Sequence, residues 1–138
     1  MAQAIAIDLA REPQSAREAR KALETFRDSL DEISFIDMRL LVSELVGEAV
    51  REHEGDGPGS ITVRAQIRDG NVWVEASEGA AAYYVPSGRP NPGEKGWGVA
   101  LVQRLSSRWG IRREKARFST IWFEMPARKS TDRSTRPA

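Results

Sequence analysis

The segment from Ser34 to His53 constrains the fold more than any other, because it predicts one long amphipathic helix. Apolar residues recur along it at spacings of three and four, which places them on one helical face. Ser34 is the expected N-cap, with Asp37 three residues later as in a capping box. The face is formed by Phe35, Met38, Val42, Leu45 and Ala49, and is widened by Ile36, Leu41, Val46 and Val50.

Glu44 and Glu48 lie one turn apart on the polar side of this helix, so both carboxylates point in the same direction. Such a pair can hold a hard cation or act as a base. The same pair can also belong to a solvated helix face, with Arg51 three residues after Glu48. Taken alone, the pair favours the solvated face, because exposed carboxylates are common.

The rest of the chain predicts an α/β two-layer sandwich with three helices on one face of a mixed, mainly antiparallel sheet. This single domain covers residues 1–126, and the polar segment 127–138 is predicted to be disordered. The other expected elements are a strand at 4–9, a helix from Pro13 to Leu30, a hairpin of strands 61–67 and 72–76, a helix from Val99 to Trp109 with Gly110 as its cap, and strands 111–116 and 118–125.

Composition excludes several classes of protein. The 138 residues include no cysteine and one histidine, which excludes disulfides, thiolate metal sites and multi-histidine centres. The net charge of +1 argues against a nucleic-acid binder, although Arg112, Arg113, Lys115 and Arg117 form a basic cluster. No apolar run approaches the roughly 18 residues of a membrane span, and the N-terminus does not resemble a signal peptide. We therefore expect a cytoplasmic protein.

A loop from Glu78 to Lys95 leads into Gly96-Trp97-Gly98, which opens a helix. A loop of this length is typical of a lid or a binding loop. Glycines at a helix N-terminus can cradle a phosphate, but they also occur in ordinary loops. By itself this motif favours the ordinary loop.

Four motifs together resemble the ATP-binding domain of anti-sigma factor serine kinases. That domain belongs to the class shared by sensor histidine kinases, gyrase and the ninety-kilodalton heat-shock chaperone. The resemblance extends from about Ile7 to Pro126. The motifs are Ser43-Glu44-Leu45-Val46-Gly47-Glu48-Ala49-Val50, Gly96-Trp97-Gly98-Val99-Ala100-Leu101-Val102, Arg108-Trp109-Gly110 and Thr120-Ile121-Trp122-Phe123.

The resemblance implies a role for each matching residue. Glu44 matches the glutamate that acts as a general base towards the attacking serine hydroxyl. Glu48 stands where the family has the asparagine that holds Mg2+ on the ATP phosphates. Gly96 and Gly98 match the glycines that follow the ATP lid.

The residue that contacts the adenine base has two candidates in this chain. Strand parity favours Glu78 as the equivalent of the family aspartate, which makes Ala80 the following glycine. The other alignment matches Ser77-Glu78-Gly79 to the family's D-x-G and makes Ser77 the equivalent. The late G-K-T of the family is replaced by Phe118-Ser119-Thr120, which keeps only Thr120.

The resemblance therefore implies a regulatory protein that binds a sigma factor or its antagonist, with ATP and Mg2+ as inherited ligands. The changes at Glu48 and at the base position predict that ATP binding is weakened or lost. The alternative is an active Mg-ATP-dependent protein serine/threonine kinase. Homodimers are common in the family, so a homodimer is a further expectation.

Overall fold

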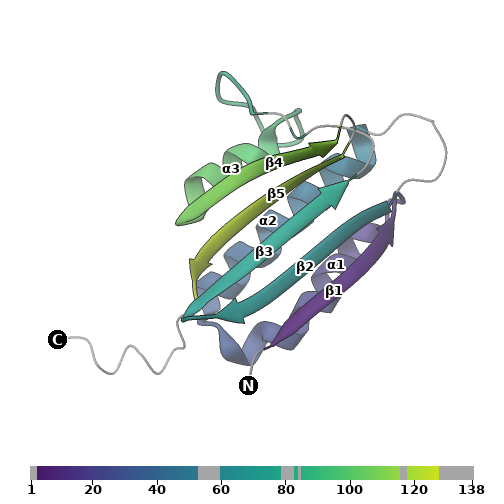
Figure 1. Ribbon diagram of the computed structural model, residues 1–138. Coiled ribbons are helices and arrows are strands. Elements are labelled where there is room, and N and C mark those ends of the chain that lie inside the picture. Colours follow the sequence, from purple (N-terminus) through teal and green to yellow (C-terminus); the bar gives the residue numbers. More distant parts are fainter. Residues whose placement is uncertain (1–2, 53–59, 79–82, 84, 116–117, 128–138) are drawn as a thin grey trace.

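A five-stranded antiparallel sheet forms one layer of the molecule (Figure 1). The computed structural model describes residues 3–52, 60–78, 83, 85–115 and 118–127. The strands are β1 (Ala4–Ala10), β2 (Ser60–Arg68), β3 (Asn71–Glu78), β4 (Arg108–Lys115) and β5 (Phe118–Pro126). They lie in the order β1-β2-β3-β5-β4, and the described strands contain no parallel pair.

The helices form the second layer and lie on one face of the sheet (Figure 1). They are α1 (Ser15–Ala22), the 3-10 helix η1 (Leu23–Ser29), α2 (Glu32–Glu52) and α3 (Trp97–Leu105). The predicted helix from Pro13 to Leu30 is thus α-helical only as far as Ala22. The predicted two-layer sandwich is confirmed.

The long central helix α2 begins earlier than its sequence indicated. The Asp31 carboxylate accepts the backbone N–H of Ser34 at 2.8 Å, so Asp31 caps the helix. The Ser34 hydroxyl instead donates to the carbonyl of Pro126 at 2.9 Å. The prediction of Ser34 as the N-cap was therefore wrong, because an equally good cap residue precedes it by one turn.

The predicted end of α3 was also wrong. The helix ends at Leu105, and Ser106 is extended. Trp109 and Gly110 belong to β4, where Gly110 pairs with Trp122 of β5. Gly110 is therefore not a helix cap.

One hydrophobic core joins the two layers. Phe35, Met38, Val42, Leu45 and Ala49 of α2 are all buried, as their spacing predicted. Ile36, which was expected to widen this face, is instead 54% exposed. Among the described residues, no helix combines the length and the hydropathy that a membrane span requires.

The opposite face of the sheet carries a stacked pair of tryptophans. The rings of Trp73 and Trp122 lie 4.6 Å apart at an angle of 5°. Arg68 lies over Trp73 and Arg108 over Trp122, at 4.4 and 5.9 Å from the ring centroids. Cations at these distances are attracted to the ring faces.

Candidate functional site

Glu48 joins the C-terminal half of α2 to the N-terminus of α3. The backbone N–H of Gly96 donates to Glu48 Oε2 at 2.6 Å, and that of Gly98 donates to Oε1 at 3.0 Å. The first N–H groups of a helix have no partner within the helix and need an outside acceptor. Here the acceptor is a carboxylate of the same chain, whose negative charge faces the positive end of the helix dipole.

The two glycines make this close approach possible. Gly96 has a φ of 89°, in the left-handed region where other residues are strained. A Cβ on Gly98 would lie 3.1 Å from Leu45 Cδ2 and 3.2 Å from Glu48 Oε1. The absence of side chains therefore lets the start of α3 pack directly on α2.

The motif alone favoured an ordinary loop, but the N–H groups of Gly96 and Gly98 form a cradle at the start of α3, and Glu48 fills it. A phosphate bound at this helix N-terminus would need the same N–H groups. It would also place negative charge beside an ionised carboxylate, which repels it. With Glu48 in this position, these residues do not fit a nucleotide phosphate. Among the described residues, no group of three or more His, Cys, Asp or Glu side chains could hold a metal ion.

A second buried contact lies at the end of β3. Glu78 is 4% exposed, and its Oε1 lies 3.7 Å from Arg11 Nη1. The same nitrogen donates to the carbonyl of Ala49 in α2 at 3.5 Å. Glu78, one of the two candidates for the adenine-contacting residue, is therefore paired with a buried arginine of this chain.

Tyr83 lies close to this ion pair. Burial raises the pKa of its hydroxyl well above the ordinary value, and the charge of Glu78 raises it further. The Tyr83 hydroxyl and the Nε and Nη2 atoms of Arg11 are buried, and they have no hydrogen-bond partner in the part of the chain that the structure describes. Buried polar groups are rarely left unpaired, because this lowers stability. We therefore expect these three atoms to reduce the stability of the fold.

The two candidates for the base position, Glu78 and Ser77, lie on opposite faces of the sheet. Side chains alternate between the faces of a strand, and Val72, Val74, Ala76 and Glu78 share the buried helix side. Ser77 therefore points to the other face, where its hydroxyl lies 2.7 Å from that of Thr120. Ser77 and Thr120 thus lie across the sheet from Glu48.

Glu44 is partly exposed on α2, and it forms no hydrogen bond or ion pair with another described residue. Gly79 and Ala80 lie outside the described residues. The structure thus brings together Glu48, Gly96 and Gly98, and places Glu78 on the same side of the sheet.

Sequence reasoning missed Arg11 and did not assign a role to Tyr83. Arg11 directly follows the apolar alternation of β1, where a charged residue is ordinary. No local pattern in the sequence indicates that its side chain turns inward to Glu78. Only the pairing of β1 with β2, and of β2 with β3, brings the two residues together.

Comparison with known proteins matches residues 9–124 to the model of the histidine kinase-like ATPase domain. No curated protein matches the chain. Among solved structures, the RsbU and RsbW domains of Rv1364c from Mycobacterium tuberculosis are similar, with a TM-score of 0.69 and 22% identity over 90% of this chain. The histidine kinase domain of the Erythrobacter litoralis EL346 blue-light activated histidine kinase is similar with a TM-score of 0.53 and 17% identity over 82% of this chain.

At these identities the two structures show a common fold. The present chain covers 32% of the Rv1364c chain and 59% of the histidine kinase chain.

Proposed function

This chain belongs to the histidine kinase-like ATPase domain family, and from that premise we propose that it is a regulatory protein that acts by binding a sigma factor or its antagonist. In this proposal its ATP binding is weakened or lost. The support for partner binding is the resemblance of its motifs to those of anti-sigma factor kinases. The similarity in fold to the RsbW domain is consistent with it.

The observation that carries the loss of ATP binding is the pair of hydrogen bonds from Gly96 and Gly98 to Glu48. A hydrogen bond to a charged group contributes about 1.5–3 kcal/mol net. An incoming phosphate has to break both bonds and displace the carboxylate. Each 1.4 kcal/mol of this cost lowers affinity about tenfold.

The ion pair between Arg11 and Glu78 supports the same proposal from the base end. To contact adenine, Glu78 would have to leave Arg11, whose side chain is only 4% exposed. Separating a buried pair leaves an uncompensated charge, which costs about 3–5 kcal/mol. In this proposal the phosphate end and the base end of the nucleotide site are therefore both occupied by contacts within the chain, at Glu48 and at Glu78.

Calorimetric titration with Mg-ATP tests the proposal. For the natural protein we expect a Kd weaker than about 1 mM, which corresponds to roughly 4 kcal/mol of binding. Glu48→Asn shortens the side chain and removes its charge, so we expect at least about tenfold tighter binding. A micromolar Kd for the natural protein would contradict the proposal.

Glu48→Gln is the matched control, because it keeps the length of the side chain and removes only the charge. A glutamine still reaches the cradle and its carbonyl oxygen can accept one of the two N–H groups, so we expect a gain smaller than that of Glu48→Asn. Equal affinities for both variants would show that charge alone closes the cradle.

The second candidate function is an active protein serine/threonine kinase with Glu44 as the general base. It is favoured by the partial exposure of Glu44, which leaves its carboxylate accessible to a substrate. Transfer of labelled phosphate from ATP to a sigma-factor antagonist, abolished by Glu44→Ala, would establish this activity. Transfer that survives Glu44→Ala would exclude that role for Glu44.

A further inference from the structure

A groove lies between the α1–η1 segment and the N-terminal half of α2, away from Glu48. It has a volume of about 680 Å³. We call it the α1–α2 groove, and define it by six of its lining residues: Arg20, Arg27, Ile36, Arg39, Leu40 and Ser43.

An apolar ridge of α2 borders this groove. Ile33, Ile36 and Leu40 are 63%, 54% and 40% exposed, and their spacing of three and four places them on one side of the helix. Seven residues of helix correspond to a ridge of about 10 Å. Contiguous exposed apolar side chains rimmed by polar residues are typical of a protein interaction site.

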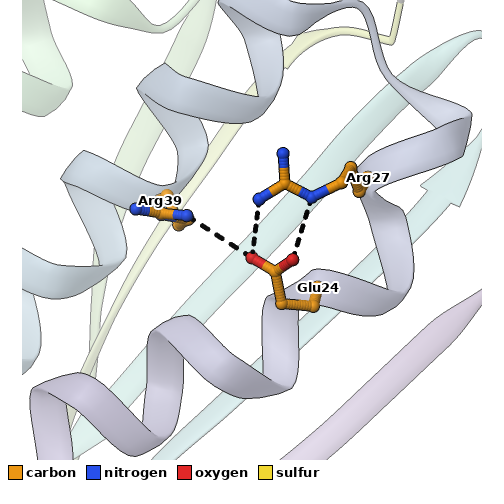
Figure 2. Close-up of polar contacts among 3 residues, drawn as sticks. All are labelled: Glu24, Arg27 and Arg39. Carbon is orange, nitrogen blue, oxygen red and sulfur yellow. Dashed lines mark hydrogen bonds and ion pairs between the residues drawn. The ribbon is translucent and has the colours of Figure 1, made fainter.

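The arginines of the groove are held in position before any partner arrives. Figure 2 shows the Glu24 carboxylate between Arg27 and Arg39. Arg27 donates to both Glu24 oxygens, at 2.9 and 3.0 Å, and Arg39 lies 3.4 Å from one of them. The Arg27 and Arg39 guanidinium carbons also lie 4.5 and 5.7 Å from the centroid of the buried Phe35 ring. The hydrogen bonds from Arg27 lower the pKa of Glu24, so this carboxylate stays ionised.

The charge of the groove is positive. Glu32 is the one glutamate among the residues that line the groove, and Glu24, which is outside the lining, is shared between Arg27 and Arg39. Arg20 Nη1 donates to the neutral Ser43 hydroxyl at 2.6 Å, and among the described residues Arg20 has no carboxylate partner. The lining thus contains three arginines and one glutamate, which is an excess of positive charge.

We propose that the α1–α2 groove binds an amphipathic helix of a protein partner, which places apolar side chains on Ile36 and Leu40 and carboxylates towards Arg20 and Arg39. This inference rests on the proposed function, in which the chain acts by binding a protein. The backbone groups of α1 and α2 are bonded within their helices, so a partner strand would find no edge to extend. A helix packs between two others through side chains, at axial distances of 8–10 Å. The exposed side chains of Ile33, Ile36 and Leu40 can neither pair with nor donate a hydrogen bond to a nucleic-acid phosphate.

The test uses a synthetic helical peptide with leucines at spacings of three and four and flanking glutamates, titrated into the full-length 15N-labelled protein. We expect amide shifts concentrated on residues 20–43, and no comparable shifts with a peptide that has lysines in place of the glutamates. Ile36→Asp should weaken binding at least about tenfold, and Arg20→Ala about threefold to tenfold.

Val85→Asp and Lys21→Ala are the matched controls, because they change an exposed apolar and an exposed basic residue that do not line the groove. Both should leave the peptide affinity unchanged. Circular dichroism of each variant checks that it is folded. An Ile36→Ala variant, which adds no charge, should show the same direction of effect as Ile36→Asp.

Four results would overturn the proposal. They are absence of shifts in the groove, equal binding of the lysine peptide, groove shifts with a DNA duplex in place of the peptide, and a homodimer in sedimentation that Ile36→Asp dissociates. The last result would assign the groove to a second copy of this chain. Titration with Mg-ATP reports on Glu48 and not on the groove, so failure of the groove and failure of the proposed function are distinguishable.

Discussion

Gly98 is the residue whose missing side chain matters most at the junction of α2 and α3. A Cβ there would meet Leu45, which is buried, and the Glu48 oxygen that accepts the Gly98 N–H. Neither neighbour can move without loosening the core or the hydrogen bond. Close packing of this kind makes even one methyl group costly.

We predict that Gly98→Ala lowers the free energy of unfolding by about 1 kcal/mol, because overpacking outweighs the gain in helix propensity. Gly47→Ala is the control, since a Cβ there would meet only the mobile end of Arg51, at 3.2 Å. Gly47→Ala should be stabilising by up to about 1 kcal/mol. Urea unfolding of both variants measures the contrast, and a stabilising Gly98→Ala would contradict it.

Tyr83 makes stability depend on pH in the alkaline range. The pKa of its hydroxyl in the folded chain is raised above the ordinary value of 10.0, because burial disfavours the phenolate. The folded state therefore keeps its proton while the unfolded state loses it. The contribution of the protonated Tyr83 hydroxyl to the free energy of unfolding is fully present below pH 10 and is lost as the pH rises towards the folded pKa.

We predict that Tyr83→Phe, which cannot ionise, raises the pH at which the protein unfolds in alkali. At neutral pH the change should cost little, because the hydroxyl has no hydrogen-bond partner among the described residues. Circular dichroism followed from pH 9 to about 12 measures the shift. An unchanged alkaline midpoint would show that Tyr83 is accessible to solvent in the folded state.

At the scale of the elements, strands β4 and β5 are joined by an unusually close contact. The Trp122 ring lies over Gly110, and a Cβ on Gly110 would be 2.6 Å from Trp122 Nε1. Gly110 therefore leaves the space in which Trp122 can stack on Trp73 of β3.

We predict that Gly110→Ala displaces the Trp122 ring and abolishes the exciton signal of the stacked tryptophans in far-ultraviolet circular dichroism. It should also lower stability by about 1–3 kcal/mol, as overpacking does. Trp73→Phe is the control, because it should abolish the signal without crowding Gly110. Persistence of the signal in Gly110→Ala would mean that the ring lies elsewhere.

Periodicity predicted much of the fold, because it encodes which side of an element is buried. It identified the buried face of α2 and the hairpin, whose turn at Asp69 and Gly70 has positive φ values of 52° and 77°. It could not fix the width of that face, so Ile36 was misplaced. It assigned Gly110 to a helix end because the ring that covers it belongs to another strand.

The candidate site could be predicted less completely, for a physical reason. Gly96 and Gly98 mark a close approach, and the sequence indicates this locally. Glu48 reaches these N–H groups only because of where α2 lies relative to α3. This is a tertiary contact, since Gly96 and Gly98 are separated from Glu48 by 48 and 50 positions in the sequence. The same is true of Arg11, which meets Glu78 only when three strands are paired.

At the scale of the whole molecule, one core receives side chains from all the helices and from every strand. We therefore predict a single cooperative unfolding transition in urea. Far-ultraviolet circular dichroism and tryptophan fluorescence should give coincident curves, as two-state behaviour requires. Two separated transitions would show more than one cooperative unit and would contradict this prediction.

The position of Glu48 has a consequence for how the cradle could ever be opened. A carboxylate attached to α2 is held beside the α3 N–H groups at an effective concentration that does not depend on how much protein is present. A free anion in the same place could be diluted or dialysed away, but this one cannot. Opening the cradle therefore requires the side chain to turn away or α2 to move relative to α3, so access is governed by the conformation of the chain itself.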